Sequence, residues 1–155
     1  MAQVRKKAAE IETRLRDFEH SLPMELLKAR EAAMSRFRPM LREHGLTEQQ
    51  WRVIRALADH PDTSASELAR LSFLLSPSLT RILQHLEGEG VLKRAGDAAD
   101  QRRSVFRLTA KGRRLFANVA PDSEQAYADI EREFGSKRLN ELYRLLAEFN
   151  RALGD

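Results

Sequence analysis

The stretch 75–87 carries the side chains whose types and spacing best suit recognition chemistry. Apolar residues recur there at three- and four-residue intervals from Leu79 to Leu86, which predicts a short helix with one buried stripe. Ser76 before Pro77 predicts the helix start, with a hydroxyl cap and a proline at the first helical position. The opposite face carries hydroxyl, amide, imidazole and guanidinium groups: Ser78, Thr80, Arg81, Gln84 and His85. Such groups read base edges and phosphates in a DNA major groove, and an ordinary solvated helix face is the alternative.

A β-hairpin is expected after this helix, with strands near 91–94 and 104–108. The polar turn between them carries the adjacent arginines Arg102 and Arg103, just after Asp100. A solvated turn needs polar residues but not paired arginines, and Asp100 can hold one of them extended by a charge-assisted hydrogen bond. Narrow minor grooves attract extended arginines. The helix and the hairpin together therefore favour DNA binding over an ordinary surface.

The elements that must position these residues are helical. Thr47 and Ser64 begin capping boxes, Pro39 should kink its helix, and Pro121 should interrupt another. The expected helices cover about 4–20, 22–44, 47–58, 64–71, 75–87, 109–134 and 139–153. Short helices followed by a two-stranded ribbon predict a mainly α fold with a small β-hairpin wing, the winged helix-turn-helix.

Charge is unevenly distributed along the 155 residues, although the formal net charge is only +4. The stretch 93–114 holds eight basic and two acidic residues, whereas the stretch from 115 to the end holds eight acidic and five basic residues. A basic block beside an acidic remainder predicts a local surface for a polyanion.

Several classes of protein are excluded or disfavoured. The chain has no cysteine, so disulfides and thiolate metal sites are excluded. The start of the sequence lacks the apolar run of a signal peptide, and no stretch approaches a membrane span, so we expect a soluble, cytoplasmic protein. The four histidines have no metal-ligand spacing, and no catalytic motif is present. We therefore expect no metal, no cofactor and no enzyme activity.

A set of motifs in order resembles the MarR family of bacterial transcriptional regulators. The motifs are Gly45–Trp51, Ser66–Ala69, Leu79–Arg81, Asp100–Arg103 and Leu108–Gly112, and the similarity runs from about 26 to 153. The segment 37–45 is similar to the branch of homoprotocatechuate-degradation operon repressors. One departure is Ala98, which stands where the wing commonly has proline and leaves the wing turn less rigid.

The resemblance implies an obligate homodimer that reads a pseudo-palindromic operator in double-stranded DNA. It implies N-terminal dimerisation helices at 1–45, a winged helix-turn-helix DNA-binding domain at 46–109 and C-terminal dimerisation helices at 110–155. The sequence agrees independently, because the terminal helices carry wider apolar stripes than a monomer of this size could easily cover.

Family matching also assigns DNA-binding residues. They are Ser76, Pro77, Ser78, Thr80, Arg81 and His85 on the helix, and Arg102 and Arg103 in the wing with Asp100 orienting them. Ser64 and Ser66 are expected to contact phosphates because they lie at a helix N-terminus. MarR-like regulators commonly release DNA when a small aromatic acid or phenol binds. The residues expected to bind such a ligand are Ser35, Arg38, His44, Trp51 and Arg55, since an aromatic carboxylate needs a flat apolar slot and a cation.

The function expected from sequence is a repressor of genes for aromatic-compound catabolism, released from DNA by an aromatic ligand. Two alternatives remain open. One is a winged-helix DNA-binding protein that senses no ligand, which ligand-independent operator affinity would reveal. The other is a winged-helix protein-interaction module, which failure to bind any duplex at low salt would favour.

Overall fold

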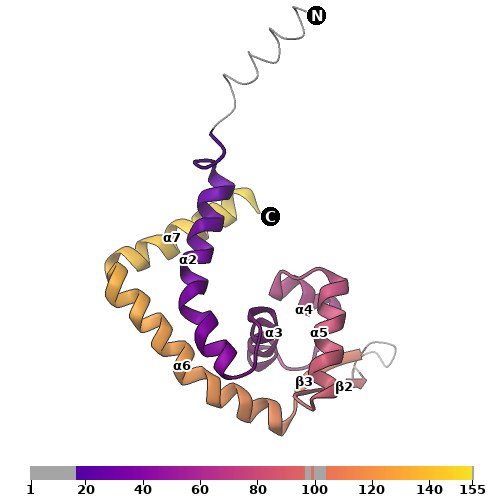
Figure 1. The fold of residues 1–155 in the computed structure, drawn as a ribbon. Helices are drawn as coiled ribbons and strands as arrows, with labels where there is room; N and C mark the ends of the chain where they lie inside the picture. Colours follow the sequence, from indigo (N-terminus) through magenta and orange to yellow (C-terminus); the bar gives the residue numbers. More distant parts are fainter. Residues whose placement is uncertain (1–16, 97–98, 100–103, 155) are drawn as a thin grey trace, which may run out of the picture. The chain divides into compact units, whose positions relative to one another are not determined.

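The structure, a computed structural model, describes residues 17–96, 99 and 104–154 (Figure 1). The chain divides into two compact units, residues 1–35 and 36–155, and each is described by itself. The helices are α2 (Leu22–Glu43), α3 (Glu48–Asp59), α4 (Ala65–Ser72), α5 (Ser76–Gly88), α6 (Ala110–Phe134) and α7 (Ser136–Leu153). The strands are β1 (Thr63–Ser64), β2 (Leu92–Gly96) and β3 (Ser104–Leu108).

The described part of the N-terminal unit leads into α2. Ser21 donates its hydroxyl to the Phe18 carbonyl at 2.9 Å, and Lys28 donates to the Glu19 carbonyl at 2.6 Å. These bonds use the polar groups of the turn before the helix to fix where α2 begins. Most of the helix expected at 4–20 lies outside the described residues.

The core of the unit 36–155 is the predicted winged helix-turn-helix. Helices α3, α4 and α5 pack through leucine, isoleucine and valine side chains spaced one helical turn apart. The fully buried side chains include Val53, Ile54, Leu57, Leu68, Leu79 and Leu86. The capping box at Thr47 is confirmed: its side chain accepts from the Gln50 backbone N–H, and the Gln50 side chain accepts from the Thr47 backbone N–H.

The sheet has three antiparallel strands in the order β1-β3-β2. The expected hairpin is confirmed, with Leu92 opposite Leu108 and Arg94 opposite Phe106. The sequence did not predict β1, in which Thr63 pairs with Phe106 and Ser64 with Val105. This two-residue strand attaches the hairpin to the loop before α4, so the wing and the helix-turn-helix form one body.

Two predicted helix boundaries need correction. The N-cap of α5 is Leu75 rather than Ser76, it makes no side-chain capping bond among the described residues, and Pro77 is the second helical residue. Ser76 lies inside the helix, where its carbonyl accepts from the Thr80 hydroxyl at 2.9 Å. Helix α6 also continues through Pro121 without interruption. The proline removes only one backbone hydrogen bond, and buried residues before and after it, Val119 and Ser123, anchor the helix.

The start of α6 lies very close to the turn between α5 and β2. Thr109 caps α6 by accepting from the Gly112 N–H at 3.0 Å, and its hydroxyl also donates to the Gly90 carbonyl at 2.6 Å. A Cβ atom on Gly112 would lie 2.0 Å from the Val91 carbonyl oxygen. Only glycine permits this approach, which fixes α6 against the base of the wing.

Candidate DNA interface and ligand site

Helix α5 presents the predicted polar face to solvent. Its apolar stripe is inside, with Leu79, Leu83 and Leu86 each at most 3% exposed. The six predicted DNA-binding residues of this helix are all exposed: Ser76, Pro77, Ser78, Thr80, Arg81 and His85. The short helix α4 precedes α5 across a tight turn, as the first and second helices of a helix-turn-helix do (Figure 1).

The side chains of this face differ in what they offer to a partner. The Thr80 hydroxyl donates to its own helix at Ser76, so it has lone pairs but no free proton to offer. Arg81 forms no ion pair with any residue that the structure describes, which leaves its guanidinium available for a base edge or a phosphate. Arg81 is therefore the strongest candidate for direct readout.

The N-terminus of α4 holds the two predicted phosphate contacts. The Ser64 hydroxyl accepts from the Glu67 N–H at 3.3 Å and lies 3.2 Å from the Ser66 hydroxyl. Glu67 pairs with Arg70 through two guanidinium contacts of 2.9 and 2.5 Å, and these hydrogen bonds hold the pKa of Glu67 below its usual range. Because Glu67 is ionised at neutral pH, it largely neutralises Arg70 and leaves Ser66 exposed beside a capped helix end.

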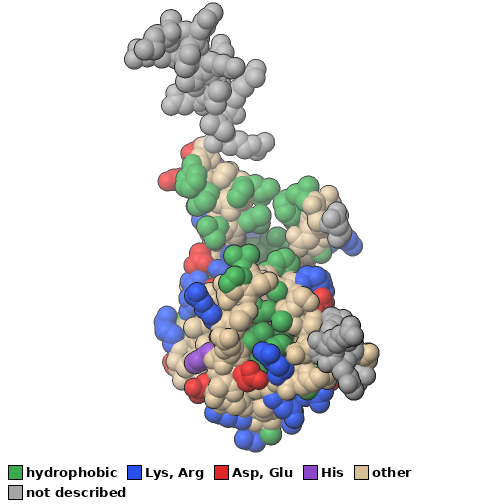
Figure 2. Space-filling view, turned by 90° about the vertical axis from the view of Figure 1, so that its right-hand side faces the viewer, with side chains coloured by type: hydrophobic (Ala, Val, Ile, Leu, Met, Phe, Trp, Pro, Cys, Tyr) green, Lys and Arg blue, Asp and Glu red, His purple; other side chains and the backbone are tan. Residues whose placement is uncertain are grey.

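The wing contributes further basic side chains. Asp100, Arg102 and Arg103 lie outside the described residues. In the strands, the Arg94 guanidinium lies 5.2 Å from the centre of the Phe106 ring, a cation–π contact on the surface of the hairpin. Figure 2 looks at the side of the molecule where α4 and α5 lie, and it shows Lys and Arg side chains along the lower edge of the unit 36–155. Within the described part of the predicted basic block, all the Lys and Arg side chains are exposed except that of Arg107, which is half-buried.

Two of the residues expected to bind a ligand already contact a carboxylate of the protein. Arg38 Nε lies 3.2 Å from Glu48 at the start of α3, and His44 Nε2 lies 2.7 Å from Asp122 on α6. Ser35 belongs to the unit 1–35, where its hydroxyl donates to the Ala32 carbonyl at 2.7 Å. Ligand recognition by Arg38 or His44 would therefore have to compete with a carboxylate of the protein.

The other two, Trp51 and Arg55, lie one turn apart on α3 and both contact α6. The Trp51 ring is 7% exposed and stacks on Phe116 at a centroid distance of 5.6 Å. The Arg55 Nη1 atom lies 3.5 Å from the Tyr127 hydroxyl, and Tyr127 packs edge-on against Phe37 at 4.8 Å. A guanidinium and a phenol beside aromatic rings can bind a hydroxylated aromatic acid.

Sequence reasoning missed Tyr127. Its signal is its position: buried residues recur on α6 at Val119, Ser123 and Ala126, and Tyr127 lies at the edge of that stripe. A tyrosine at such an edge packs its ring inward and keeps its hydroxyl accessible.

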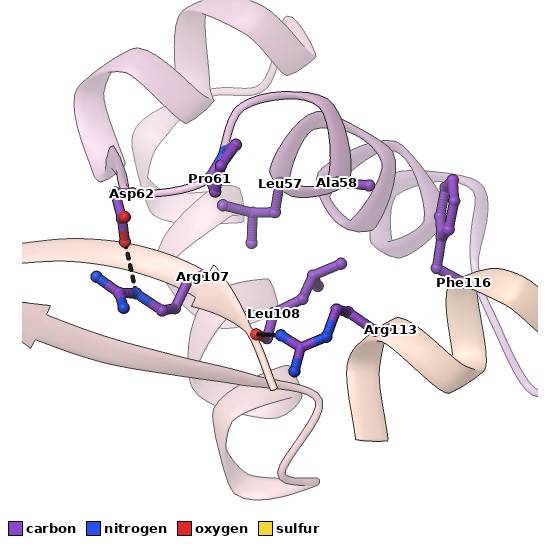
Figure 3. A pocket seen from close by; sticks show the side chains of 8 residues that line it. All are labelled: Leu57, Ala58, Pro61, Asp62, Arg107, Leu108, Arg113 and Phe116. Carbon is purple, nitrogen blue, oxygen red and sulfur yellow. Dashed lines mark hydrogen bonds and ion pairs between the residues drawn. The ribbon is translucent and has the colours of Figure 1, made fainter. Parts of the chain in front are cut away.

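The structure also contains a cavity of about 460 Å³, between the end of α3, the loop after it, β3 and the start of α6 (Figure 3). It is lined by Leu57, Ala58, Pro61, Asp62, Arg107, Leu108, Arg113 and Phe116. The five residues expected to bind a ligand are not among those that line it.

Across residues 17–96, 99 and 104–154, no cluster of His, Asp and Glu could hold a metal ion. Within the same residues, no helix is both long and apolar enough to cross a bilayer.

An exposed polar helix after a tight turn, a basic hairpin beside it and an apolar core beneath both define a winged helix-turn-helix DNA-binding protein. Comparisons with known proteins agree. The model of the MarR family matches residues 44–103. The homoprotocatechuate degradative operon repressor of Escherichia coli is 43% identical over 129 residues, which cover 83% of this chain and 87% of that protein.

Solved structures give the same result. The transcriptional regulator PA4135 is 45% identical with a TM-score of 0.80, covering 84% of this chain and 96% of that one. NadR in complex with 4-hydroxyphenylacetate is 38% identical with a TM-score of 0.75, covering 87% and 96%. The repressor CouR, bound to a 23-mer DNA duplex, is 25% identical with a TM-score of 0.76, covering 87% and 97%.

The chain belongs to the MarR family. It is therefore a transcriptional regulator with a winged helix-turn-helix, of a family whose members bind DNA operators as dimers and are not enzymes. The resemblance and the fold class predicted from sequence are both confirmed.

Proposed function

We propose that this protein is a cytoplasmic, dimeric repressor of genes for aromatic-compound catabolism, and that a small aromatic acid releases it from its operator. The observation that carries the proposal is the exposed polar face of α5, where Arg81 forms no ion pair with any described residue, on a helix whose other face buries Leu79, Leu83 and Leu86 in the core. The similarity to a homoprotocatechuate degradative operon repressor and to NadR with its 4-hydroxyphenylacetate supports the choice of ligand class.

In this proposal residues 46–109 read DNA. The exposed residues of α5 enter the major groove, Ser64 and Ser66 contact phosphates at the start of α4, and the wing arginines Arg102 and Arg103 reach the minor groove. CouR bound to a DNA duplex supports this use of the fold. Two copies then read half-sites about 34 Å apart, one helical turn of DNA.

Arg81→Ala is expected to weaken operator binding by about 1–3 kcal/mol and to relax the preference at one base pair of each half-site. A contact to phosphate would instead weaken all sequences equally and lower the salt slope by about one unit. Fluorescence anisotropy on the operator and on single-base variants, at several salt concentrations, distinguishes the two.

Arg70→Ala is the matched control, because Glu67 already neutralises this exposed arginine of α4. It should change operator affinity much less than Arg81→Ala does. Unaltered affinity and sequence preference for the Arg81 variant would remove α5 as the reading helix.

The dimerisation region is proposed to comprise 1–45 and 110–155. Helix α7, which the structure describes along its whole length, has no buried side chain. Its exposed apolar residues are Leu142, Tyr143, Leu145 and Leu153. A surface helix that leaves these side chains in water is stabilised when a second copy of the chain covers them.

The effector site is proposed to lie between α3 and α6, with Arg55 binding the ligand carboxylate, Tyr127 a hydroxyl, and Trp51 the wall of the slot. Arg38 and His44 remain proposed members at its edge, and Ser35 remains a proposed ligand-binding residue from the sequence. Release of DNA is a population shift: the ligand favours a spacing of the two reading helices that no longer matches the half-sites.

Arg55→Gln and Tyr127→Phe test the effector site. Arg55→Gln should weaken binding of 4-hydroxyphenylacetate at least about tenfold, since a hydrogen bond to a charged group contributes roughly 1.5–3 kcal/mol. Tyr127→Phe should reduce the preference for the hydroxylated acid over phenylacetate. Without ligand, both variants should bind the operator as tightly as the wild type, which a parallel titration measures. If the acid released both variants from DNA as readily as it releases the wild type, the site would be refuted.

A further inference from the structure

The cavity of Figure 3 combines apolar walls with charged side chains. The end of α3 and the following loop supply Leu57, Ala58 and Pro61, and the opposite wall comes from Leu108 and Phe116. A volume of about 460 Å³ lies within the range of small-molecule sites, and apolar walls with a few convergent polar groups are typical of them.

Two arginines and one aspartate line this cavity: Arg107, Arg113 and Asp62. Arg113 is held in place by a bond from Nη1 to the Leu108 carbonyl at 3.1 Å. Arg107 Nε lies 2.5 Å from Asp62 Oδ1, but the N–H does not point along that contact, and the buried Nε atom has no hydrogen-bond acceptor within the described residues. Among the described residues Asp62 pairs with Arg107 alone, through a poorly directed contact, and Arg113 has no carboxylate partner.

We propose that this cavity binds a small carboxylic acid with an apolar body. It is a second binding site, distinct from the proposed effector site. The acid's carboxylate pairs with Arg107 and Arg113, and its body lies against Leu57 and Phe116. A carboxylate can accept well-directed hydrogen bonds from two guanidinium groups, which Asp62 does not provide for Arg107 Nε. The apolar walls favour such an acid over a DNA phosphate, since a phosphate gains nothing from apolar surface.

The site is separate from the proposed effector site and does not depend on it. Arg55 and Tyr127 do not line the cavity, and Arg107 and Arg113 do not contact them in any described interaction. The cavity does adjoin the wing, because the Asp62–Arg107 pair joins the loop before β1 to strand β3. An acid that pairs with Arg107 competes with Asp62 and loosens this connection.

Isothermal titration of the full-length protein with phenylacetate, and with uncharged phenylacetamide, tests the proposal. Arg113→Gln removes the cation and keeps most of the side chain, while Ala58→Leu fills part of the cavity without changing charge. The matched control is Arg114→Gln, the exposed neighbour that does not line the cavity. Circular dichroism and thermal melts establish that each variant is folded.

Phenylacetate is expected to bind in the cavity, and phenylacetamide is not. This binding should persist in the Arg55→Gln and Arg114→Gln variants, and its affinity should fall at least about tenfold in Arg113→Gln and Ala58→Leu. If Arg55→Gln alone removes all binding, the cavity is no site and the effector proposal stands. If Arg113→Gln alone removes it, the cavity stands and the effector site fails.

Trp51 provides a second readout. It is the single tryptophan of the chain and stacks on Phe116, a wall of the cavity, so phenylacetate should change its fluorescence even in the Arg55→Gln variant. Loss of DNA affinity in Arg113→Gln, with no acid binding by the wild type, would show a phosphate contact and overturn the proposal.

Discussion

Gly112→Ala is expected to destabilise the unit 36–155 by about 2 kcal/mol or more. The added Cβ atom would lie 2.0 Å from the Val91 carbonyl oxygen and 3.3 Å from Leu108 Cβ, so backbone rather than a flexible side chain has to move. Alanine gains up to about 1 kcal/mol over glycine in helix propensity, but overpacking of this kind typically costs about 1–3 kcal/mol and occasionally more. The clash therefore outweighs the propensity, and thermal unfolding followed by circular dichroism measures the difference.

Gly88→Ala is the matched control for this substitution. Gly88 is also helical, at the end of α5, and a Cβ atom there meets nothing within 4 Å. Its melting temperature should equal that of the wild type or exceed it slightly, whereas Gly112→Ala should melt several degrees lower, at roughly 2–4 °C per kcal/mol. Equal melting temperatures for the wild type and Gly112→Ala would contradict the close packing of α6 on the turn before the wing.

Leu142→Asp combined with Leu145→Asp is expected to dissociate the dimer and to abolish high-affinity operator binding. These side chains are 40% and 48% exposed in the single chain, at neighbouring positions on α7. Each leucine that dimerisation buries contributes about 1 kcal/mol or more, and two-fold symmetry applies each substitution twice. The dissociation constant of the dimer should therefore rise at least about a thousandfold, which light scattering coupled to size exclusion measures.

The matched control adds the same two charges at polar positions of the same helix, Asn140→Asp with Asn150→Asp. Both asparagines are exposed, so this variant should remain dimeric and bind the operator. A dimer that persists in the Leu142 and Leu145 variant would place the contact between copies elsewhere in the chain.

Local patterns predicted the parts of the fold that local physics determines. The apolar stripe of α5 and the capping box at Thr47 depend on residues three or four apart, and the structure confirms both. Strand β1 could not be predicted in this way. Its two residues, Thr63 and Ser64, carry no periodic pattern, and the strand exists because β3 pairs with it.

The start of α5 shows how a local rule fails. Serine before proline is a good sequence signal for a capped helix, yet Leu75 occupies the capping position and Ser76 the first helical one. The turn from α4 ends with Phe73 in the left-handed region, at φ 50°, and the chain direction after it decides where α5 begins. A capping preference of about 1 kcal/mol does not override that connection.

The proposed ligand site was predictable only in part, because its chemistry depends on pairs that sequence does not reveal. Trp51 and Arg55 share a helix face, so their proximity followed from their spacing. The pairing of Arg38 with Glu48, of His44 with Asp122 and of Arg55 with Tyr127 depends on how α2, α3 and α6 pack. The cavity at the base of the wing likewise assembles four segments, and no motif indicated it.

The most direct test of the account is a titration of the protein against the DNA upstream of its own gene, with and without hydroxylated aromatic acids. We predict tight, salt-dependent binding that 4-hydroxyphenylacetate or a related acid reverses, with Arg55→Gln still binding but no longer released. Tight binding that no acid disturbs would contradict the effector part of the account. Failure to bind any duplex at low salt would contradict its central claim and indicate a protein-interaction module.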